Sequence, residues 1–224
     1  MGKVALVTGA RGGIGAAIVE RLEADDWIVH GVDVDDADLT TREGNRTVIE
    51  MALAAHGRLD AIVPNAGFQH VAPVTDFPEE TWDQLLALLL TSPFLLAKYA
   101  WEALVASGEG RICVIASAHA LTASPFKAGY VAAKHGVLGL VKTLALEGAD
   151  VGITATAVCP AFVRTPLAER QVEERGLHAV IEPHAVKRML EPSEVAELVA
   201  FLLGPTGGAI TGVAVPIDLG WTAR

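Results

Sequence analysis

Short apolar runs alternate with longer helix-like stretches along this chain of 224 residues. The short runs are rich in β-branched residues and predict strands at residues 4–8, 28–33, 61–64, 111–116, 154–159 and 214–218. The longer stretches predict helices near residues 13–25, 42–56, 79–107, 130–148 and 192–203. Strands and helices that alternate in this way form a parallel sheet covered on both faces. We therefore expect a doubly wound α/β fold, a single domain over residues 1–224.

One interval is too short for a complete Rossmann arrangement. Between Asp33 and Leu59 there is room for one helix, at residues 41–56, whereas a full half of the fold needs a further helix and strand. Residues 34–39 are too few to supply both. We predict that the usual edge strand and its helix are missing, which leaves about six strands in the order 2-1-3-4-5-6.

Composition narrows the class of partner. Hydrophobic residues make up 51% of the chain, and the net charge is −10 without a cluster of basic residues. Such a chain is poorly suited to nucleic acid or an anionic membrane, so we expect a small-molecule substrate. Cys113 and Cys159 lie inside apolar runs, which indicates reduced thiols in a cytoplasmic protein and neither a disulfide nor a metal site. The first strand begins at once, so we expect no signal peptide.

A glycine-rich turn, Thr8-Gly9-Ala10-Arg11-Gly12-Gly13-Ile14-Gly15, joins the first predicted strand to the first helix. Glycines let the backbone approach a pyrophosphate, and the helix N-terminus supplies N–H donors and positive charge. Asp33 ends the second strand, where a carboxylate accepts hydrogen bonds from both ribose hydroxyls and repels a 2′-phosphate. Arg11 would attract such a phosphate, but Asp33 is placed to oppose it. We predict NAD rather than NADP.

Three further residues suggest alcohol chemistry. Tyr130 and Lys134 are four residues apart and share one face of a helix, and Ser117 follows the fourth strand. A free tyrosine has a pKa of about 10, and a neighbouring ammonium lowers that pKa. Ser117 would hold a substrate oxygen while Tyr130 transfers a proton. The Tyr-Lys spacing alone is weak evidence, because it occurs by chance on many amphipathic helices and then marks only a surface pair. The surrounding motifs therefore decide.

Together, these motifs resemble the short-chain dehydrogenase/reductase family over essentially the whole chain. The resemblance implies that Tyr130 transfers the proton, Ser117 positions the oxygen, and Lys134 lowers the tyrosine pKa and binds the nicotinamide ribose. A hydride would then pass directly between cofactor and substrate carbon. The implied cofactor-binding residues are Gly9, Arg11, Gly12, Gly13, Ile14, Gly15, Asp33, Asp38, Leu39, Asn65, Ala66, Gly67, Tyr130, Lys134, Pro160, Val163 and Thr165.

One position departs from the family pattern. Aligning residues 82–92 puts Leu89 where many members have an asparagine that supports a water relay to the lysine. Leucine neither donates nor accepts hydrogen bonds, so the relay must use a backbone carbonyl or another route. We expect slower turnover as a result.

Several segments resemble the D-3-hydroxybutyrate dehydrogenases in particular: residues 67–73, 116–119, 127–137 and 165–167. That resemblance implies a pocket for a small carboxylate, and its substrate-binding residues are Gln69, Ser117, His119, Lys127, Phe162 and Gln171. Trp221 matches an aromatic residue that closes the pocket, in some tetramers from a neighbouring subunit. Residues 165–190 would form a substrate lid, shorter than is usual in the subgroup.

The leading interpretation is an NAD-dependent oxidoreductase that interconverts a secondary alcohol and a ketone on a small 3-hydroxy acid such as 3-hydroxybutyrate. The alternatives are a 3-oxoacyl-thioester or steroid/polyol reductase on the same scaffold, or an NAD-binding protein with little catalysis. Residues 85–106 and 131–146 are unusually apolar but contain interruptions such as Pro93 and Glu102, which favours buried or interface helices over a membrane span. By resemblance they form an interface in a homotetramer or homodimer; burial within a monomer is the alternative.

Overall fold

Six parallel strands form one sheet in the order β2-β1-β3-β4-β5-β6. The computed structural model describes residues 2–223, apart from the side chains of Leu167, Arg170 and Arg175. The strands are β1 (Val4–Thr8), β2 (Ile28–Val32), β3 (Ala61–Val63), β4 (Arg111–Ile115), β5 (Thr154–Pro160) and β6 (Val213–Ile217). The strand order and number confirm the prediction from the sequence. The predicted range 1–224 exceeds the described residues by one at each end.

Strand β2 takes the edge position, because residues 33–41 form turns and lead directly into helix α2 (Arg42–His56). Thr41 begins this helix, and its hydroxyl oxygen accepts a hydrogen bond from the backbone N–H of Gly44 at 3.0 Å. Strand β2 pairs with β1 from Val4↔Ile28 to Thr8↔Val32, and Ile28 is 40% exposed on the free side. As predicted, residues 2–223 contain no further edge strand beyond β2 and no helix to accompany it.

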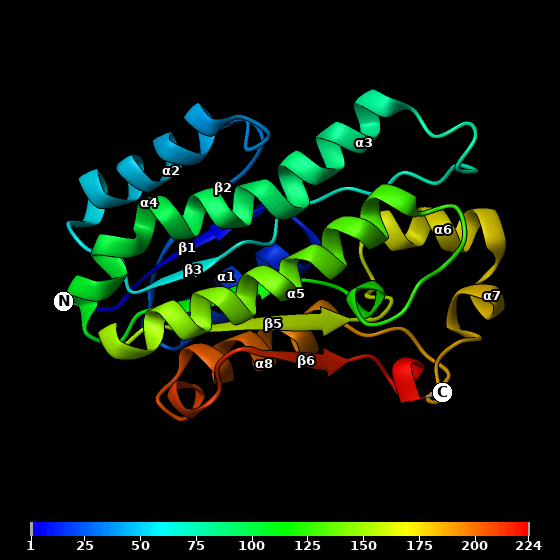
Figure 1. Ribbon diagram of the computed structural model, residues 1–224. Helices are drawn as coiled ribbons and strands as arrows, with labels where there is room; N and C mark the ends of the chain where they lie inside the picture. The colour runs from blue at the N-terminus through cyan, green and yellow to red at the C-terminus, as the bar shows by residue number, and fades with distance from the viewer. Residues whose placement is uncertain (1, 224) are drawn as a thin grey trace.

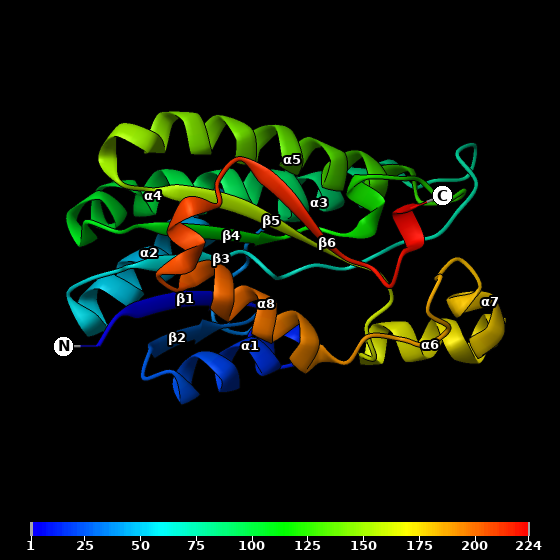
Figure 2. The same cartoon turned by 90° about the horizontal axis from the view of Figure 1, so that it is seen from below.

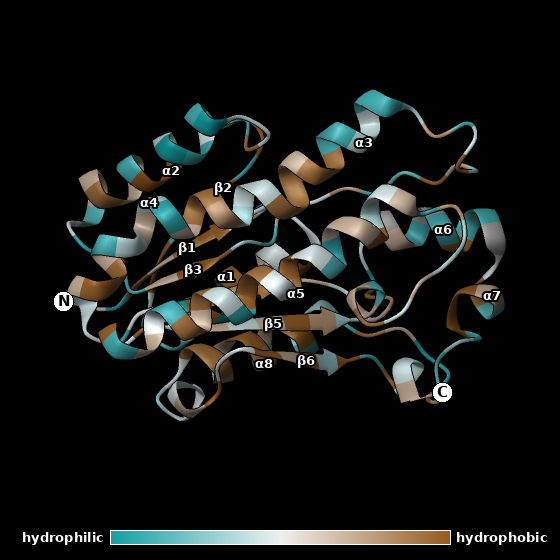
Figure 3. Ribbon diagram, viewed as in Figure 1, coloured by the Kyte–Doolittle hydropathy of each residue, from teal (hydrophilic) through white to brown (hydrophobic). Residues whose placement is uncertain are grey.

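Two helical layers cover the sheet (Figure 1 and Figure 2). Helices α2, α4 (Ser92–Ser107) and α5 (Ala128–Gly148) lie on one face, and α1 (Gly13–Ala24) and α8 (Pro192–Leu203) lie on the other. Successive strand residues point to opposite faces, so Leu6 packs toward the first layer and Val7 toward the second. Figure 3 shows the strands as almost continuously hydrophobic, as a sheet buried on both faces requires.

The predicted helix 79–107 is interrupted. It consists of α3 (Glu79–Leu86), a π-helical turn (Ala87–Thr91) and α4. Pro93, in the first turn of α4, has no N–H to donate, which accounts for a change in helical hydrogen bonding just before it. By length and composition, this element is the one helix among the described residues that could cross a membrane. Several of its apolar side chains, among them Leu85, Leu95 and Leu104, are buried inside the fold.

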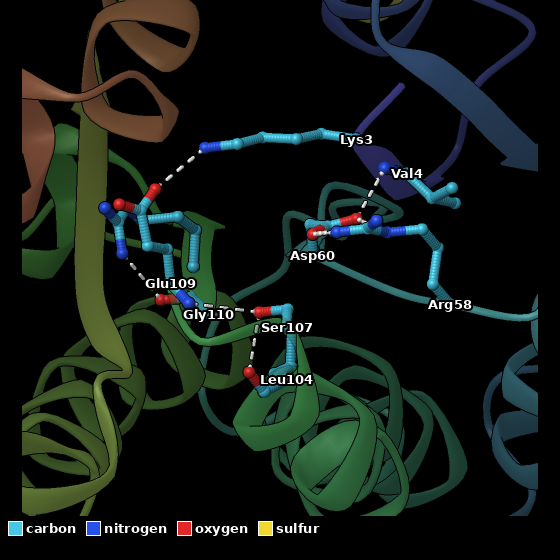
Figure 4. A network of polar contacts seen from close by, with 9 residues as sticks. Lys3, Val4, Arg58, Asp60, Leu104, Ser107, Glu109 and Gly110 are labelled. Atoms are coloured by element: carbon cyan, nitrogen blue, oxygen red, sulfur yellow. Dashed lines mark hydrogen bonds and ion pairs between the residues drawn. The ribbon is translucent and has the colours of Figure 1, made fainter. Parts of the chain in front are cut away.

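Charged side chains hold together the amino ends of the central strands (Figure 4). Asp60 is buried and accepts hydrogen bonds from the backbone N–H of Val4 at 2.8 Å and from Arg58 at 2.6 and 2.9 Å. Lys3 and Glu109 form an ion pair at 3.0 Å between the starts of β1 and β4. This network stabilises the end of the sheet opposite the carboxyl ends, where the remaining loops gather.

Two short helices, α6 (Pro166–Arg175) and α7 (Leu177–Ile181), project beyond the carboxyl ends of the strands (Figure 1). They occupy most of the segment 165–190 in which we expected a lid. Thr165 begins α6, and its hydroxyl oxygen accepts from the backbone N–H of Ala168 at 3.4 Å.

Candidate active site

A cleft of about 660 Å³ opens at the carboxyl ends of β1 to β5. Residues that follow five different strands line it, as expected for a ligand site in a doubly wound sheet. Every predicted cofactor-binding and substrate-binding residue lines this cleft except Arg11 and Gly15. Trp221 also lines it from the same chain, so a neighbouring subunit is not needed to supply that residue.

The glycine-rich turn is shaped by its backbone. Gly9 and Gly13 have φ angles of +64° and +52°, which favour glycine. A Cβ atom on Gly15 would overlap the carbonyl oxygen of Gly9, so Gly15 allows α1 to pack against the turn. Gly12 precedes α1 and has no atom within 4 Å of an added Cβ. The turn therefore presents open backbone and a helix N-terminus to the cleft, which fits a dinucleotide pyrophosphate.

Two charged residues, Asp33 and Arg11, lie at the glycine-rich turn. The Asp33 carboxylate lines the cleft and accepts hydrogen bonds from the backbone N–H groups of Arg11 at 3.0 Å and Val34 at 2.8 Å. The Arg11 guanidinium forms ion pairs with Asp35 at 3.0 Å and Asp36 at 2.8 Å. Arg11 stays a predicted cofactor-binding position in the glycine-rich turn, and its guanidinium is engaged by two carboxylates that do not line the cleft.

Thr8, which is not among the predicted site residues, joins two loops of the cleft. Its hydroxyl oxygen accepts from the backbone N–H groups of Asn65 and Ala66, both at 3.0 Å. The Asn65 amide donates in return to the carbonyl oxygens of Thr8 at 2.9 Å and Gly9 at 3.2 Å. These contacts join the loops after β1 and β3. The Asn65 side chain therefore shapes the nucleotide floor by holding its backbone in place.

Ser117, Tyr130 and Lys134 meet where β4 and α5 enter the cleft. Ser117 and Lys134 are buried, at 7% and 6% exposure. The Lys134 ammonium donates to the backbone carbonyl of Ile115 at 2.7 Å and lies 5.7 Å from the centroid of the Tyr130 ring. Ser117 lies close enough to Tyr130 to lower the pKa of its phenol. The i,i+4 spacing and the end of the preceding strand thus bring the three side chains together.

The expected lowering of the Tyr130 pKa by Lys134 is not found. Part of the Tyr130 side chain is exposed, but its hydroxyl is buried, and this burial raises the pKa of Tyr130 because the phenolate loses its solvation. The neighbouring Ser117 acts in the opposite direction and lowers the pKa of Tyr130. Burial also lowers the pKa of Lys134 to about 8. The effect of burial on the Tyr130 pKa is therefore larger than that of Ser117.

Leu89 lies on the π-helical turn, is 2% exposed, and lines the cleft. It also lines a small cavity of about 10 Å³ beside Lys134, together with Thr8 and Ser92. Gly67 packs closely against it, since an added Cβ there would lie 2.8 Å from a Leu89 methyl group. Leu89 therefore presents methyl groups to the space next to the lysine.

The opposite wall of the cleft combines polar and aromatic side chains. Gln171 donates to the side-chain oxygen of Gln69 at 3.4 Å, and the Gln69 amide nitrogen is buried without a hydrogen-bond partner among the described residues. Lys127 is 4% exposed, and its ammonium lies 5.6 Å from the centroid of the Phe162 ring. His119 is 4% exposed, and burial together with Lys127 lowers its pKa to about 4.

Aromatic rings close this wall. Phe162 and Trp221 stack with centroids 5.5 Å apart, and Trp221 meets His119 edge-on at 4.9 Å. His184, from the segment expected to form the lid, contacts Phe162 and Trp221 at 6.0 and 5.8 Å and makes a 2.7 Å hydrogen bond from Nδ1 to the carbonyl of Arg188. Sequence patterns gave no signal for the position of His184, because its contacts come from distant segments.

The fold and this cleft define a dinucleotide-binding oxidoreductase. A family model described as enoyl-(acyl carrier protein) reductase matches residues 30–222. The D-beta-hydroxybutyrate dehydrogenase of Rhizobium meliloti (strain 1021) is 36% identical, over all of both chains, and that of Cupriavidus necator is 36% identical over 100% of this chain and 99% of the relative. The ligand-free aldohexose dehydrogenase of Thermoplasma acidophilum superposes with a TM-score of 0.93, 28% identity, and coverage of 100% of this chain and 95% of that one.

The chain belongs to the short-chain dehydrogenase/reductase family, and it is a nicotinamide-dependent oxidoreductase. The alignment with the Rhizobium enzyme spans 258 positions, more than the 224 residues of this chain. This chain therefore carries deletions relative to that enzyme, in keeping with its six-stranded sheet.

Proposed function

We propose that this enzyme interconverts a short 3-hydroxy acid, such as 3-hydroxybutyrate, and the corresponding 3-oxo acid with NAD. The observation that carries the proposal is the buried side chain of Lys127, which lines the same cleft as Ser117 and Tyr130. A lysine ammonium in a substrate cleft favours an anionic substrate, because it can form a charge-assisted hydrogen bond with a carboxylate.

Neighbouring groups suit the same carboxylate. The Gln69 amide nitrogen offers a donor without a partner among the described residues, and His119 lines the same cleft with its ring edge-on to Trp221. The Phe162–Trp221 stack restricts the length of the substrate beyond this point. A carboxylate held here would leave the substrate C3 oxygen near Ser117 and Tyr130.

The residues divide the chemistry between them. When bound, the nicotinamide ring exchanges a hydride with the substrate carbon. Ser117 donates a hydrogen bond to the substrate oxygen, and Tyr130 exchanges a proton with it. Lys134 keeps its ammonium beside Tyr130 and would contact the nicotinamide ribose. The backbone of Val163 and the hydroxyl of Thr165 would hold the nicotinamide carboxamide.

The charges around Asp33 support NAD over NADP. Asp33 lines the cleft, and Asp35 and Asp36 neutralise the one nearby arginine. A 2′-phosphate at this position would be repelled by the Asp33 carboxylate, and the guanidinium of Arg11 is already engaged by Asp35 and Asp36. We therefore expect NADP to bind weakly.

A spectrophotometric screen tests the activity. We expect NADH formation with D-3-hydroxybutyrate and none with the L form, and loss of turnover in Tyr130→Phe, which removes the phenol oxygen. Methyl 3-hydroxybutyrate, which has no charge, should react far more slowly than the acid. Equal rates with acid and ester would contradict the carboxylate pocket.

A second candidate is a 3-oxoacyl-thioester reductase. Val71 and Phe126 are 55% and 54% exposed beside Gln69 and Lys127, and the backbone N–H of Ala72 donates to the carbonyl of Phe126 at 2.9 Å. Such an apolar rim suits the long arm of a thioester. Faster reduction of acetoacetyl-thioesters than of acetoacetate would favour this candidate.

We also propose a cytoplasmic homotetramer or homodimer assembled through α4 and α5. Phe94 on α4 and Leu146 on α5 are 43% and 81% exposed. Large apolar side chains that are exposed on neighbouring helices suit a protein–protein interface. Light scattering coupled to size-exclusion chromatography tests the assembly, and a monomeric mass at micromolar concentration would contradict it.

A further inference from the structure

A chain of hydroxyl and imidazole groups leads from Tyr130 toward the protein surface. Ser117 and Tyr130 line the same cleft, and Ser117 acts on the phenol by lowering its pKa. The Oγ atom of Ser117 lies 3.5 Å from Nδ1 of His119, whose ring meets that of Tyr130 edge-on at 5.9 Å. On the other side of the imidazole ring, Nε2 lies 2.9 Å from Oγ of Ser124. Ser124 is half-buried, and its neighbours Ala123 and Pro125 are exposed. The contacts of Ser117 and His119 therefore lead from the surroundings of the phenol to a surface loop.

The lysine side of Tyr130 offers a poorer route. The Lys134 ammonium is bonded to the backbone of Ile115, and Leu89 covers the neighbouring space with methyl groups. The small cavity there holds about 10 Å³, roughly the minimum for one water molecule. Its Ser92 hydroxyl already donates to Asn45 at 2.6 Å. A proton would find few free donors and acceptors on this side.

We propose that His119 and Ser124 form a proton path that connects Tyr130, through Ser117, to solvent. The proposal rests on the proposed function, because Tyr130 must exchange one proton with solvent for each substrate oxygen that it protonates or deprotonates. In this path Ser124 is a positioning residue, since it acts on Tyr130 only through His119.

The proton balance is simple for carbonyl reduction. Tyr130 gives its proton to the substrate oxygen and becomes a phenolate. Ser117 passes its hydroxyl proton to the phenolate and takes the Nδ1 proton of His119. His119 takes a proton at Nε2 from Ser124, and Ser124 takes one from water. One proton enters from solvent and one leaves on the substrate, and His119 ends with its proton at Nε2 instead of Nδ1. Oxidation runs the same steps in reverse and returns the ring to the Nδ1–H tautomer.

Imidazole is suited to this task because its neutral form has one donor and one acceptor nitrogen. Burial, with a contribution from Lys127, lowers the pKa of His119 to about 4, so the ring stays neutral at physiological pH. It therefore relays by exchanging tautomers. The 3.5 Å separation between Nδ1 and Ser117 is longer than the 2.9 Å between Nε2 and Ser124, and it is the step that we expect to limit transfer.

The test compares three variants. Ser124→Ala removes the hydroxyl of the path, and Ser124→Thr keeps one. Thr122→Val is the control, because it removes a hydroxyl from the same loop that makes no side-chain hydrogen bond among the described residues. The readout is the single-turnover rate of NADH oxidation with acetoacetate in H₂O and D₂O. Ser124→Ala should slow this rate about tenfold, less than the ~10²–10⁴-fold typical of a direct proton-transfer group, and should increase the solvent isotope effect. The KM values should stay within about twofold, because no binding contact is removed. Ser124→Thr and Thr122→Val should behave like the wild type.

A purely structural role would give a different result. If Ser124→Ala raises KM alone, or leaves both the rate and the isotope effect unchanged, the path is wrong while the proposed function stands. If the wild type turns over none of the hydroxy acids, the proposed function fails instead. The path is then tested by nitrogen NMR of histidine-labelled protein: Ser124→Ala should shift the tautomer ratio of His119 and Thr122→Val should not. An unchanged ratio would overturn the path.

Discussion

The nucleotide half of the cleft is formed mainly by backbone, whereas the substrate half is formed mainly by side chains. The nucleotide half relies on backbone: glycines with positive φ, the start of α1, and loops joined by Thr8 and Asn65. The substrate half relies on side chains from distant loops, including Lys127, Phe162 and Trp221. The first half should therefore be sensitive to an added Cβ atom and the second to a change of functional group.

The largest effect is expected from Gly15→Ala. Its Cβ would overlap the Gly9 carbonyl, so the turn must move, and we expect a loss of about 3 kcal/mol in the free energy of unfolding. NAD affinity should fall with it. Urea denaturation and NAD titration check both. Gly12→Ala is the control for stability, because an added Cβ there meets nothing within 4 Å; equal destabilisation by both variants would refute a backbone-built turn.

Lys127→Met tests the substrate half. Removal of the ammonium should raise KM for acetoacetate about 100-fold, since a charged hydrogen bond contributes up to ~3 kcal/mol. The unfolding free energy should change by less than about 1.5 kcal/mol, because methionine fills a similar volume. Steady-state kinetics with acetoacetate and its methyl ester provide the measurement. The variant should lose the preference for the acid over the ester. If the variant keeps this preference, Lys127 does not bind the substrate carboxylate.

Acid should destabilise the protein, largely through the substrate half. His119 has a folded pKa of about 4, below its ordinary value near 6.5, so it binds a proton more readily when unfolded. The contribution of His119 to the free energy of unfolding is present above pH 6.5 and is lost as the pH falls toward 4. The loss amounts to about 2 kcal/mol between pH 7 and pH 5. Burial lowers the pKa of His184 and of His30 in the same direction. Denaturation at stepped pH should show a shallower slope in His119→Gln; identical slopes would contradict the assignment.

The smallest effect is expected from Asp33→Ser, and it concerns the affinity for the cofactor. Asp33 is the main side chain that the nucleotide half uses for binding. Loss of a charged acceptor should weaken NAD binding about tenfold and narrow the preference over NADP. Asp150→Ser is a matched control, since it removes the same charge from an exposed side chain outside the cleft. Titration of both variants with NAD and NADP measures the change. If Asp150→Ser alters the preference as much, general charge rather than Asp33 decides it.

Local patterns predicted the elements closely. Helices 42–56 and 192–203 have the predicted bounds, and β1 matches residue for residue. The count of residues between Asp33 and Leu59 also predicted the missing edge strand, because a strand and helix need a minimum length of chain. The π-helical turn at Ala87–Thr91 and the short helices α6 and α7 were not predicted, since their apolar spacing differs little from that of an ordinary helix or loop.

The sequence by itself determined the doubly wound sheet, the glycine turn and the spacing of Tyr130 with Lys134, because these depend on neighbouring residues and on chain length. Only the tertiary structure decided the electrostatics. Burial raises the Tyr130 pKa and lowers that of Lys134, and the carboxylates of Asp35 and Asp36 engage Arg11. The contacts of His119 with Ser124 and Trp221 likewise follow from packing. Desolvation and partner choice depend on everything that surrounds a group in space, and a linear pattern does not contain that information.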